Sequence, residues 1–372
     1  MKKLSILSQA AKIILTKKKV PFYAYLSVTQ ACNLTCEYCF ANSPQMMAEK
    51  RLPPKLDTEK LKSIMDELWS LGTRMLSLAG GEPMIRQDIG ELIKYSKKKG
   101  FFTQMYTNGT KSYELYLHEI KKIDHLLISI EGPKDIHDVD RKDIKGRGSY
   151  DIIFKNIETL RREKIAFTIV YSASLNNMFE IRRFIKEVEN EYKFIPRIVI
   201  AEVLHSEEGK IEGKEYANQE KLKLFWEDVK KLKAEGYPIM MSIDQMNDLI
   251  MASSKETFID TTKLYYDKKE VPKEFKQYAP CSWGKYGVFF DTSGYLYPCP
   301  KLYDEKKYAK NAFEVGFKEA YRYVSNDLPC TMCRGTINSA MTKLINITPK
   351  SAMYTAYQVA KFYIHKNRIS KS

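Results

Sequence analysis

Three cysteines near the N-terminus carry the clearest chemistry in this 372-residue chain. Cys32, Cys36 and Cys39 follow the spacing CxxxCxxC, and no fourth cysteine lies close to them in the sequence. A closed zinc site needs four ligands, usually supplied as two pairs with a longer gap between them. Three thiolates on a cubane iron–sulfur cluster would instead leave one iron able to bind a small molecule. An unusual zinc site and a chance grouping of cysteines are the alternatives.

A strand is expected directly before these cysteines. Residues 22–28 are rich in aromatic and branched side chains, which favour a β-strand. The cysteine loop would then follow the C-terminal end of a strand, where barrel enzymes place their active sites.

Beyond the cysteines, expected helices and strands alternate in six strand–helix units. The further strands are expected at residues 74–79, 102–107, 125–130, 166–172 and 197–202. The helices are expected at residues 57–71, 87–99, 112–122, 149–162, 178–191 and 219–235. Asp57 is a good N-cap, and Gly72, Gly100 and Gly236 are typical of helix ends. This alternation predicts an α/β fold with a parallel sheet and right-handed crossovers.

The cysteine motif and the sequence at the strand ends together resemble the radical S-adenosylmethionine (radical SAM) superfamily. The resemblance implies a partial (β/α)6 TIM barrel that stays open on one side. It also implies a 4Fe–4S cluster on Cys32, Cys36 and Cys39, with SAM chelated at the fourth iron. In such enzymes one electron, from a partner such as flavodoxin or ferredoxin, cleaves SAM to a 5′-deoxyadenosyl radical that abstracts hydrogen from a substrate.

The turn after the second expected strand matches a SAM-binding motif of that family. Gly80-Gly81-Glu82-Pro83 resembles its GGEP sequence. Without Cβ atoms, the two glycines let the backbone approach the amino group of SAM closely. The resemblance therefore implies that Gly80, Gly81 and Glu82 contact this cofactor.

Two further SAM contacts follow from the resemblance. Tyr38 stands before the third cysteine, at the aromatic position that contacts adenine in relatives. Residues 106–109 end the third expected strand and resemble the family's TNG sequence, which makes Asn108 a candidate contact. A plain Asn-Gly turn is the alternative at this position.

Residues 129–141 follow the family pattern SxDGP…HDxxR, which is commonest in members with a C-terminal extension. Ser129 and Arg141 are the implied contacts for the ribose and the carboxylate of SAM. Glu131 stands where the family has aspartate, which keeps the charge and lengthens the side chain.

Four further cysteines occur late in the chain: Cys281, Cys299, Cys330 and Cys333. Residues 286–291 and 295–297, joined by a turn at 292–294, predict a β-hairpin with a cysteine near each foot. The arrangement resembles the SPASM extension, in its shorter twitch form. It implies one auxiliary 4Fe–4S cluster that takes part in electron transfer. A structural zinc site and a disulfide pair are the alternatives.

The expected organisation has four parts. Residues 1–20 form an amphipathic helix, residues 21–236 the radical SAM barrel, residues 237–340 a small α+β twitch/SPASM-like domain, and residues 341–372 a second amphipathic helix. At each end, in residues 4–15 and 351–364, apolar side chains recur at helical spacing next to basic residues. In the first segment these side chains are Leu4, Leu7, Ala11 and Ile14. Such helices bind a membrane surface or, alternatively, cap the fold.

The net charge of +15, from 61 basic and 46 acidic residues, favours anionic partners. A solvated lysine-rich surface is the alternative, and nucleic acid is disfavoured because no RNA-binding module accompanies the charge. No signal peptide is recognised, and no apolar run approaches the ~20 residues that span a bilayer. We therefore expect an oxygen-sensitive cytoplasmic protein, peripheral to the membrane if its ends bind there.

The expected activity is hydrogen abstraction from a small-molecule, sugar, cyclitol or lipid-linked substrate, leading to oxidation or carbon–carbon bond formation. The alternative is a peptide maturase that forms thioether or carbon–carbon crosslinks, which predicts a leader-binding domain and two auxiliary clusters. A non-enzymatic iron–sulfur or zinc protein is the third reading. Candidate substrate contacts, each also explicable as a cap or turn residue, are Glu131, Ser172, Ser174, Asn176, Glu202 and His205. No residue is assigned as the catalytic base.

Overall fold

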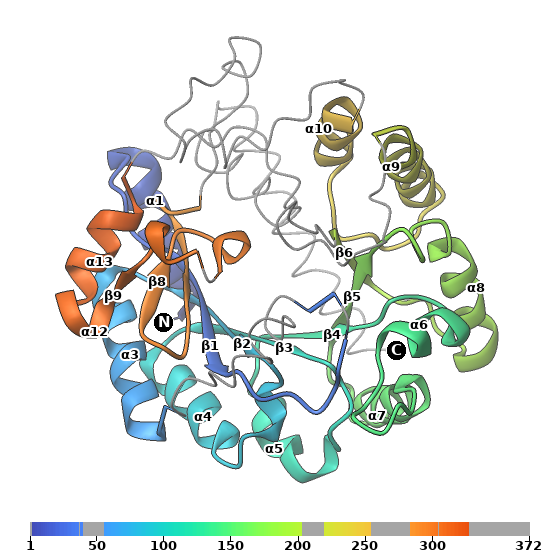
Figure 1. The fold of residues 1–372 in the computed structure, drawn as a ribbon, viewed down its shortest axis with the longest axis horizontal. Coiled ribbons are helices and arrows are strands. Elements are labelled where there is room, and N and C mark those ends of the chain that lie inside the picture. The colour runs from blue at the N-terminus through green and yellow to red at the C-terminus, as the bar shows by residue number, and fades with distance from the viewer. Residues whose placement is uncertain are drawn as a thin grey trace.

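The computed structural model describes residues 2–36, 38–39, 56–202, 219–253, 283–303 and 305–326. These residues form one nine-stranded sheet in the order β6-β5-β4-β3-β2-β1-β7-β8-β9. Six strands pair in parallel from β1 to β6, and helices surround the curved sheet on its outside (Figure 1). The expected α/β partial barrel is confirmed.

The parallel strands form where the sequence predicts them, with each end within one residue of its expected position. They are β1 (Tyr23–Thr29), β2 (Met75–Gly80), β3 (Phe102–Thr107), β4 (His125–Ser129), β5 (Phe167–Ala173) and β6 (Ile198–Glu202). Their residues are mostly branched or aromatic, which suits strands buried on both faces.

Five of the six expected helices form close to their predicted positions, whereas the one expected at residues 112–122 is only a 3₁₀ turn, Glu114–Tyr116, followed by four helical residues. The helices are α3 (Thr58–Leu71), α4 (Ile89–Lys99), α5 (Leu117–Ile120), α7 (Tyr150–Arg162), α8 (Ile181–Tyr192) and α9 (Gln219–Ala234). The Asp57 side chain accepts a hydrogen bond from the Lys60 amide at 2.7 Å, as an N-cap does. Gly72 and Gly100 end α3 and α4 in the left-handed conformation. Among the described helices from α3 to α10, two were not predicted: α6 (Lys134–Asp140) and α10 (Ile243–Ser253).

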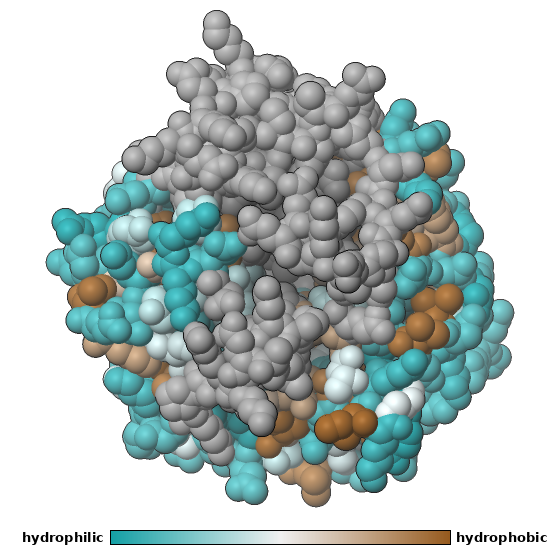
Figure 2. Space-filling model, viewed as in Figure 1, coloured by the Kyte–Doolittle hydropathy of each residue, from teal (hydrophilic) through white to brown (hydrophobic). Residues whose placement is uncertain are grey.

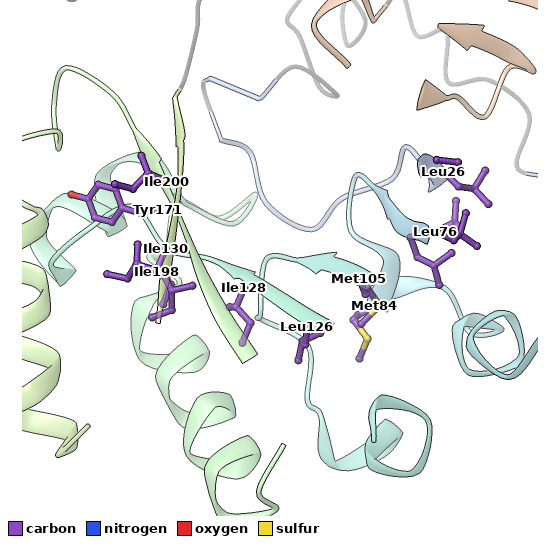
Figure 3. Close-up of a cluster of buried hydrophobic side chains, with 14 of the residues drawn as sticks. Leu26, Leu76, Met84, Met105, Leu126, Ile128, Ile130, Tyr171, Ile198 and Ile200 are labelled. Carbon is purple, nitrogen blue, oxygen red and sulfur yellow. The ribbon is translucent and has the colours of Figure 1, made fainter. Parts of the chain in front are cut away.

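An apolar layer between the sheet and the outer helices holds the barrel together. Leu26, Leu76, Met105 and Ile128 are all completely buried in it. Figure 3 shows such side chains along the sheet, from β1 and β2 across to β5 and β6. On the face seen in Figure 2, hydrophilic residues cover most of the described surface, and hydrophobic ones form small separate groups.

The predicted C-terminal hairpin forms and joins the barrel sheet. It consists of β7 (Gly287–Phe290) and β8 (Tyr295–Tyr297), followed by β9 (Lys310–Asn311) and the helices α12 (Ala312–Val315) and α13 (Phe317–Val324). Strand β7 pairs in parallel with β1, and β8 pairs antiparallel with β7. The hairpin thus lies directly beside the strand that leads to the cysteine loop. The domain limits at residues 236 and 340 stay predictions.

The N-terminal helix α1 (Lys2–Thr16) packs against the barrel through one of its faces. Ile13 is buried against Phe22 and Tyr286, with Ile6 partly buried beside them. The sequence instead suggested a face made by Leu4, Leu7, Ala11 and Ile14. Within that set Leu7 is 64% exposed. The packed face is formed instead by Ile6, Ala10 and Ile13, each one position earlier in the chain. Capping of the fold is therefore observed for α1, and membrane contact stays a prediction.

None of the helices in the described part of the chain combines the length and the apolar character needed to cross a bilayer. The second expected amphipathic segment, residues 351–364, lies outside the described residues.

Candidate active site

The two glycines after β2 lie against the chain that leads to the cysteine loop. A Cβ at Gly80 would overlap the carbonyl oxygen of Thr29, and one at Gly81 would overlap that of Ala31. The Gly81 amide donates to the Thr29 carbonyl at 2.7 Å, and the Glu82 amide donates to the Ala31 carbonyl at 2.9 Å. Gly80 also has a φ of 130°, which favours glycine. Glycine is thus required here by the fold, whatever else it contacts.

The carboxylate of Glu82 connects the ends of β2 and β3. It is completely buried and accepts hydrogen bonds from the Met84 amide at 2.9 Å, the Thr107 hydroxyl at 2.8 Å and the Asn108 amide at 2.6 Å. Burial raises the pKa of Glu82, and these hydrogen bonds act in the opposite direction. The interactions described for Glu82 are therefore with the protein itself, and its expected contact with SAM stays a prediction.

Asn108 fastens the cysteine loop to the end of β3. Its side-chain amide donates to the Asn33 side chain at 3.0 Å and lies 3.7 Å from the sulfur of Cys32. Its side-chain oxygen, Oδ1, accepts hydrogen bonds from both the amide and the hydroxyl of Thr110. Asn108 therefore orients the first cysteine as well as forming the turn.

A second contact fastens the loop on its other side. Leu34 forms an antiparallel bridge with Asp143, and the Thr35 amide donates to the Lys142 carbonyl at 2.8 Å. In Figure 1 the blue segment after β1 crosses the barrel opening towards β4. The loop is thus held between Asn108, at the C-terminal end of β3, and residues 142–143, which follow α6.

The three N-terminal thiols share one neighbourhood. Burial raises the pKa of Cys32, and it raises the pKa of Cys36 to about 12, with Cys39 acting electrostatically on both. In the described residues no three His, Cys, Asp or Glu side chains converge on a site for a single metal ion. Iron–sulfur clusters are held by cysteine thiolates, so three thiols on one fastened loop supply a suitable donor set.

Beside the thiols lies a buried ion pair. Glu131 is completely buried, and its carboxylate contacts the guanidinium of Arg141. Burial alone would lower the pKa of Arg141, yet the Glu131 carboxylate holds it well above its ordinary value. The guanidinium also lies 5.9 Å from the centre of the Tyr38 ring. Tyr38 and Arg141 are thus brought together with the cysteines, and their expected contacts with SAM stay predictions.

Several polar atoms of this group make no hydrogen bond of acceptable geometry within the described residues. Nε of Arg141 and one carboxylate oxygen of Glu131 contact each other in the ion pair, so the atoms left are the hydroxyl of Tyr38 and the other carboxylate oxygen of Glu131. Buried polar atoms are normally hydrogen-bonded, so such a cluster indicates a place where water or a ligand completes the bonding. A charged ligand with its own donors and acceptors, such as SAM, fits this requirement.

His137 connects the backbone of the two residues in the ion pair, directly at Glu131 and through Ser149 at Arg141. Its Nδ1 accepts from the Glu131 amide at 3.2 Å, and its Nε2 lies 3.0 Å from the Ser149 hydroxyl. That hydroxyl donates to the Arg141 carbonyl at 2.9 Å, so the proton of the imidazole belongs on Nε2. Burial lowers the pKa of His137 to about 4, which keeps the ring neutral.

The ends of β4 and β5 are joined by Asn177, which the sequence analysis missed. Its side-chain amide donates to the carbonyls of Glu131 and Ser172, each at 2.9 Å. The neighbouring candidate, Asn176, is exposed. Two adjacent asparagines give no sequence signal that distinguishes the inward side chain from the outward one.

The other candidates lie at the same edge of the sheet or outside the described residues. Ser129 is half-buried at the end of β4, and the buried hydroxyl of Ser174 has no hydrogen-bond partner among the described residues. Glu202 ends β6. The candidates outside the described residues are His205, Cys281, Cys330 and Cys333.

Cys299, the one described cysteine of the C-terminal group, precedes the short 3₁₀ helix Pro300–Leu302. Tyr303, which follows this helix, accepts a hydrogen bond from the side-chain amide of Gln30. Gln30 comes directly after β1, so the Cys299 segment lies next to the start of the cysteine loop.

Comparison with known proteins adds to this geometry. Residues 26–187 match the Radical SAM superfamily model. Fe-coproporphyrin III synthase of Methanosarcina barkeri is 26% identical over 240 residues, which are 63% of this chain and 58% of the relative. The cysteine-type anaerobic sulfatase-maturating enzyme of Clostridium perfringens is 28% identical over 197 residues, 49% of this chain and 52% of the relative. The chain thus spans less than two thirds of the length of these relatives.

Among solved structures, Streptococcus suis SuiB bound to S-adenosylmethionine is similar with a TM-score of 0.61 and 15% identity. The similarity covers 86% of this chain and 71% of SuiB. At this identity the similarity concerns the fold, and it agrees with the partial barrel described above.

Proposed function

We infer, from the radical SAM domain that residues 26–187 form, that this chain is an enzyme which reductively cleaves S-adenosylmethionine and abstracts hydrogen from its substrate with the 5′-deoxyadenosyl radical. Cys32, Cys36 and Cys39 would hold the 4Fe–4S cluster. When bound, this cluster supplies one electron for the cleavage and an iron that holds the methionine end of SAM.

The observation that carries this proposal is the buried pair of Arg141 and Glu131 beside the cysteine loop, with polar atoms that lack hydrogen bonds. The guanidinium of Arg141 would bind the SAM carboxylate, because a planar fork of donors matches a carboxylate. The Tyr38 ring would contact the adenine. Ser129 is the proposed ribose contact.

Chain atoms at the ends of β2 and β3 would complete the cofactor site. Gly80, Gly81 and Glu82 stay the proposed neighbours of the methionine amino group. Since Glu82 bonds to the Asn108 amide at 2.6 Å, it would also keep Asn108 against the sulfur of Cys32. This arrangement would orient the loop before the cofactor arrives.

We propose a small molecule, sugar, cyclitol or lipid-linked compound as substrate. The name Fe-coproporphyrin III synthase describes the synthesis of a small molecule, which supports this choice. The name sulfatase-maturating enzyme supports the alternative, a peptide maturase, about equally. Ser172, Ser174 and Glu202, which lie in or next to the C-terminal ends of β5 and β6, are the proposed substrate contacts.

One auxiliary 4Fe–4S cluster is proposed, held by Cys281, Cys299, Cys330 and Cys333. It would exchange an electron with the substrate radical that hydrogen abstraction leaves. The position of Cys299 beside the start of the cysteine loop supports this role. The iron content of the protein distinguishes this cluster from a structural zinc site or a disulfide pair. Two 4Fe–4S clusters contain about eight irons per chain, and one contains about four.

The test compares three proteins purified without oxygen, loaded with iron and sulfide, and reduced with dithionite. Wild type should release methionine and 5′-deoxyadenosine, and Cys32→Ala should release neither. Cys281→Ala should still cleave SAM but form no product from the substrate. Deuterium exchange between cell metabolites and labelled SAM would identify that substrate as a small molecule or a peptide.

Absence of SAM cleavage in fully loaded wild type would refute the proposed function. Product formation by Cys281→Ala would refute the role of the auxiliary cluster alone.

A further inference from the structure

A tight turn projects from the protein next to the cysteine loop. Lys142 and Gly148 form an antiparallel bridge, and the Asp143 amide donates to the Arg147 carbonyl at 2.9 Å. The Asp143 carboxylate accepts from the amides of Lys145 and Arg147 at 2.9 and 3.0 Å. These bonds give the turn, residues 142–148, a defined shape.

The base of this turn is bonded directly to the cysteine loop. The Lys142 carbonyl accepts from the amide of Thr35 at 2.8 Å, and Asp143 bridges Leu34. Thr35 is the neighbour of Cys36 in the chain. The rate of electron transfer falls steeply with distance, so a surface this close to Cys36 is a suitable entry point for an electron.

The tip of the turn is apolar, with cations around it. Ile144 is 87% exposed, and Val139 on α6 is 58% exposed. The carboxylate of Asp143 pairs with Arg147, whereas Lys142 and Lys145 make no ion pair among the described residues. On α6, Asp135 pairs with Arg183, Asp138 accepts from the Tyr150 amide, and Asp140 is buried. The excess of basic residues is therefore confined to the turn, where Lys142, Lys145 and Arg147 outnumber Asp143.

We propose that the turn at residues 142–148 is the docking site of an acidic one-electron carrier protein of the flavodoxin or ferredoxin class. The inference rests on the proposed function, which requires an electron. The carrier would lose one electron and the iron–sulfur centre held by the cysteine loop would gain it, with no bond formed or broken. Weak redox complexes use small interfaces, and complementary charge accelerates their formation. The exposed side chain of Ile144, within a turn of three basic residues and one acidic residue, fits such a partner.

The test uses the cluster-loaded full chain and the double variant Ile144→Asp/Lys145→Glu. SAM cleavage is measured with reduced flavodoxin, with reduced ferredoxin and with dithionite, and carrier binding is measured separately by titration. At carrier concentrations below saturation, the variant should be slower by roughly tenfold or more and should bind more weakly, because the charge of the docking surface is reversed. With dithionite, it should match wild type.

The matched control is Leu15→Asp/Lys98→Glu, which makes the same change of charge and polarity. Leu15 is 83% exposed on α1, and Lys98 is exposed near the end of α4, both away from the cysteine loop. The control should behave as wild type with all three reductants. Raising the salt from about 50 to about 300 mM should reduce the difference between wild type and the Ile144→Asp/Lys145→Glu variant.

Two results would overturn the docking site. One is unchanged carrier binding and carrier-driven cleavage in the variant. The other is an equal loss with dithionite, which would assign the turn to the substrate or to the fold. If wild type cleaves no SAM with any reductant, the proposed function fails instead, and the binding titration alone then decides the docking site.

Discussion

The turns after β2 and β4 each place a completely buried glutamate at the same edge of the sheet, and the two carboxylates are bonded in opposite ways. Glu82 accepts three hydrogen bonds from the chain. Glu131 pairs through one oxygen with Arg141, and its other oxygen accepts no hydrogen bond of acceptable geometry within the described residues. A carboxylate that the protein satisfies fully holds elements together, whereas one left incomplete marks a binding site.

The largest expected effect tests the structural half of this comparison. Glu82→Ala would leave three buried donors without their acceptor, and each such loss costs about 1–3 kcal/mol. We expect the free energy of unfolding to fall by about 3 kcal/mol or more, measured by denaturant titration of the metal-free protein. Thr107→Val removes one of the three bonds and also the bond that the Gly109 amide donates to the Thr107 hydroxyl, so it should cost about 2 kcal/mol. Equal, small losses in both variants would contradict the role of Glu82.

The second prediction tests the binding half. Arg141→Lys keeps the charge but loses the planar fork that matches a carboxylate. SAM affinity, measured by equilibrium dialysis of the cluster-loaded enzyme, should weaken roughly 30-fold, equivalent to about 2 kcal/mol.

The control for that measurement is Arg147→Lys, on the exposed turn, which should leave SAM affinity unchanged. Similar affinities in all three proteins would exclude Arg141 from the SAM site.

Much of the fold could be predicted from the sequence, because hydrophobic periodicity and helix-ending glycines are local signals. The strand ends and the caps at Asp57 and Gly72 are examples. Helix α6 was missed because it is short and polar, and starts after Pro133. The packed face of α1 was misplaced because apolar residues occur at helical spacing on two neighbouring faces, and only contact with the barrel selects Ile13.

The candidate site could be predicted in its residue types but not in its bonds. The cysteines, Tyr38 and Arg141 were identified by motif, and the structure brings them together. The contact between Glu131 and Arg141 and the support from His137 depend on side-chain directions at the end of a strand. Those directions are set by tertiary packing, which no local pattern contains.

A third prediction uses pH to test whether His137 is buried as a neutral ring. The unfolded chain takes up a proton near the ordinary histidine pKa of about 6.5, whereas the folded protein does so only at about 4. Stability is therefore lost as the pH falls through this window, by about 2 kcal/mol at pH 5. The difference in unfolding free energy between wild type and His137→Gln should change by that amount between pH 7 and pH 5.

A difference that stays constant with pH would contradict the neutral buried ring. The comparison with His137→Gln is needed because Asp291 acts in the opposite direction. Burial raises the pKa of Asp291 to about 6, so the folded protein takes up that proton first and gains stability as the pH falls.

The smallest expected effect sharpens the comparison between the two glutamates. Glu131→Asp keeps the charge beside Arg141, and water or SAM can fill the space left by one methylene. It should change the unfolding free energy by about 1 kcal/mol, well below the roughly 3–5 kcal/mol of removing one partner from a buried ion pair, because the charge stays beside Arg141. Glu82→Asp should cost about 2 kcal/mol, because a shorter side chain cannot reach all three donors. Denaturant titrations of the two variants in parallel measure this, and the reverse order would contradict the distinction between the two carboxylates.

The central claim is that the cysteine loop holds a cluster with one iron available to SAM. Electron–nuclear double resonance on the reduced enzyme, with SAM labelled in its amino and carboxylate groups, tests this directly. Wild type should show couplings from both labels, and Arg141→Lys should show weaker ones at the same sub-saturating SAM concentration. A fully loaded wild type that shows no coupling to either label would contradict the central claim.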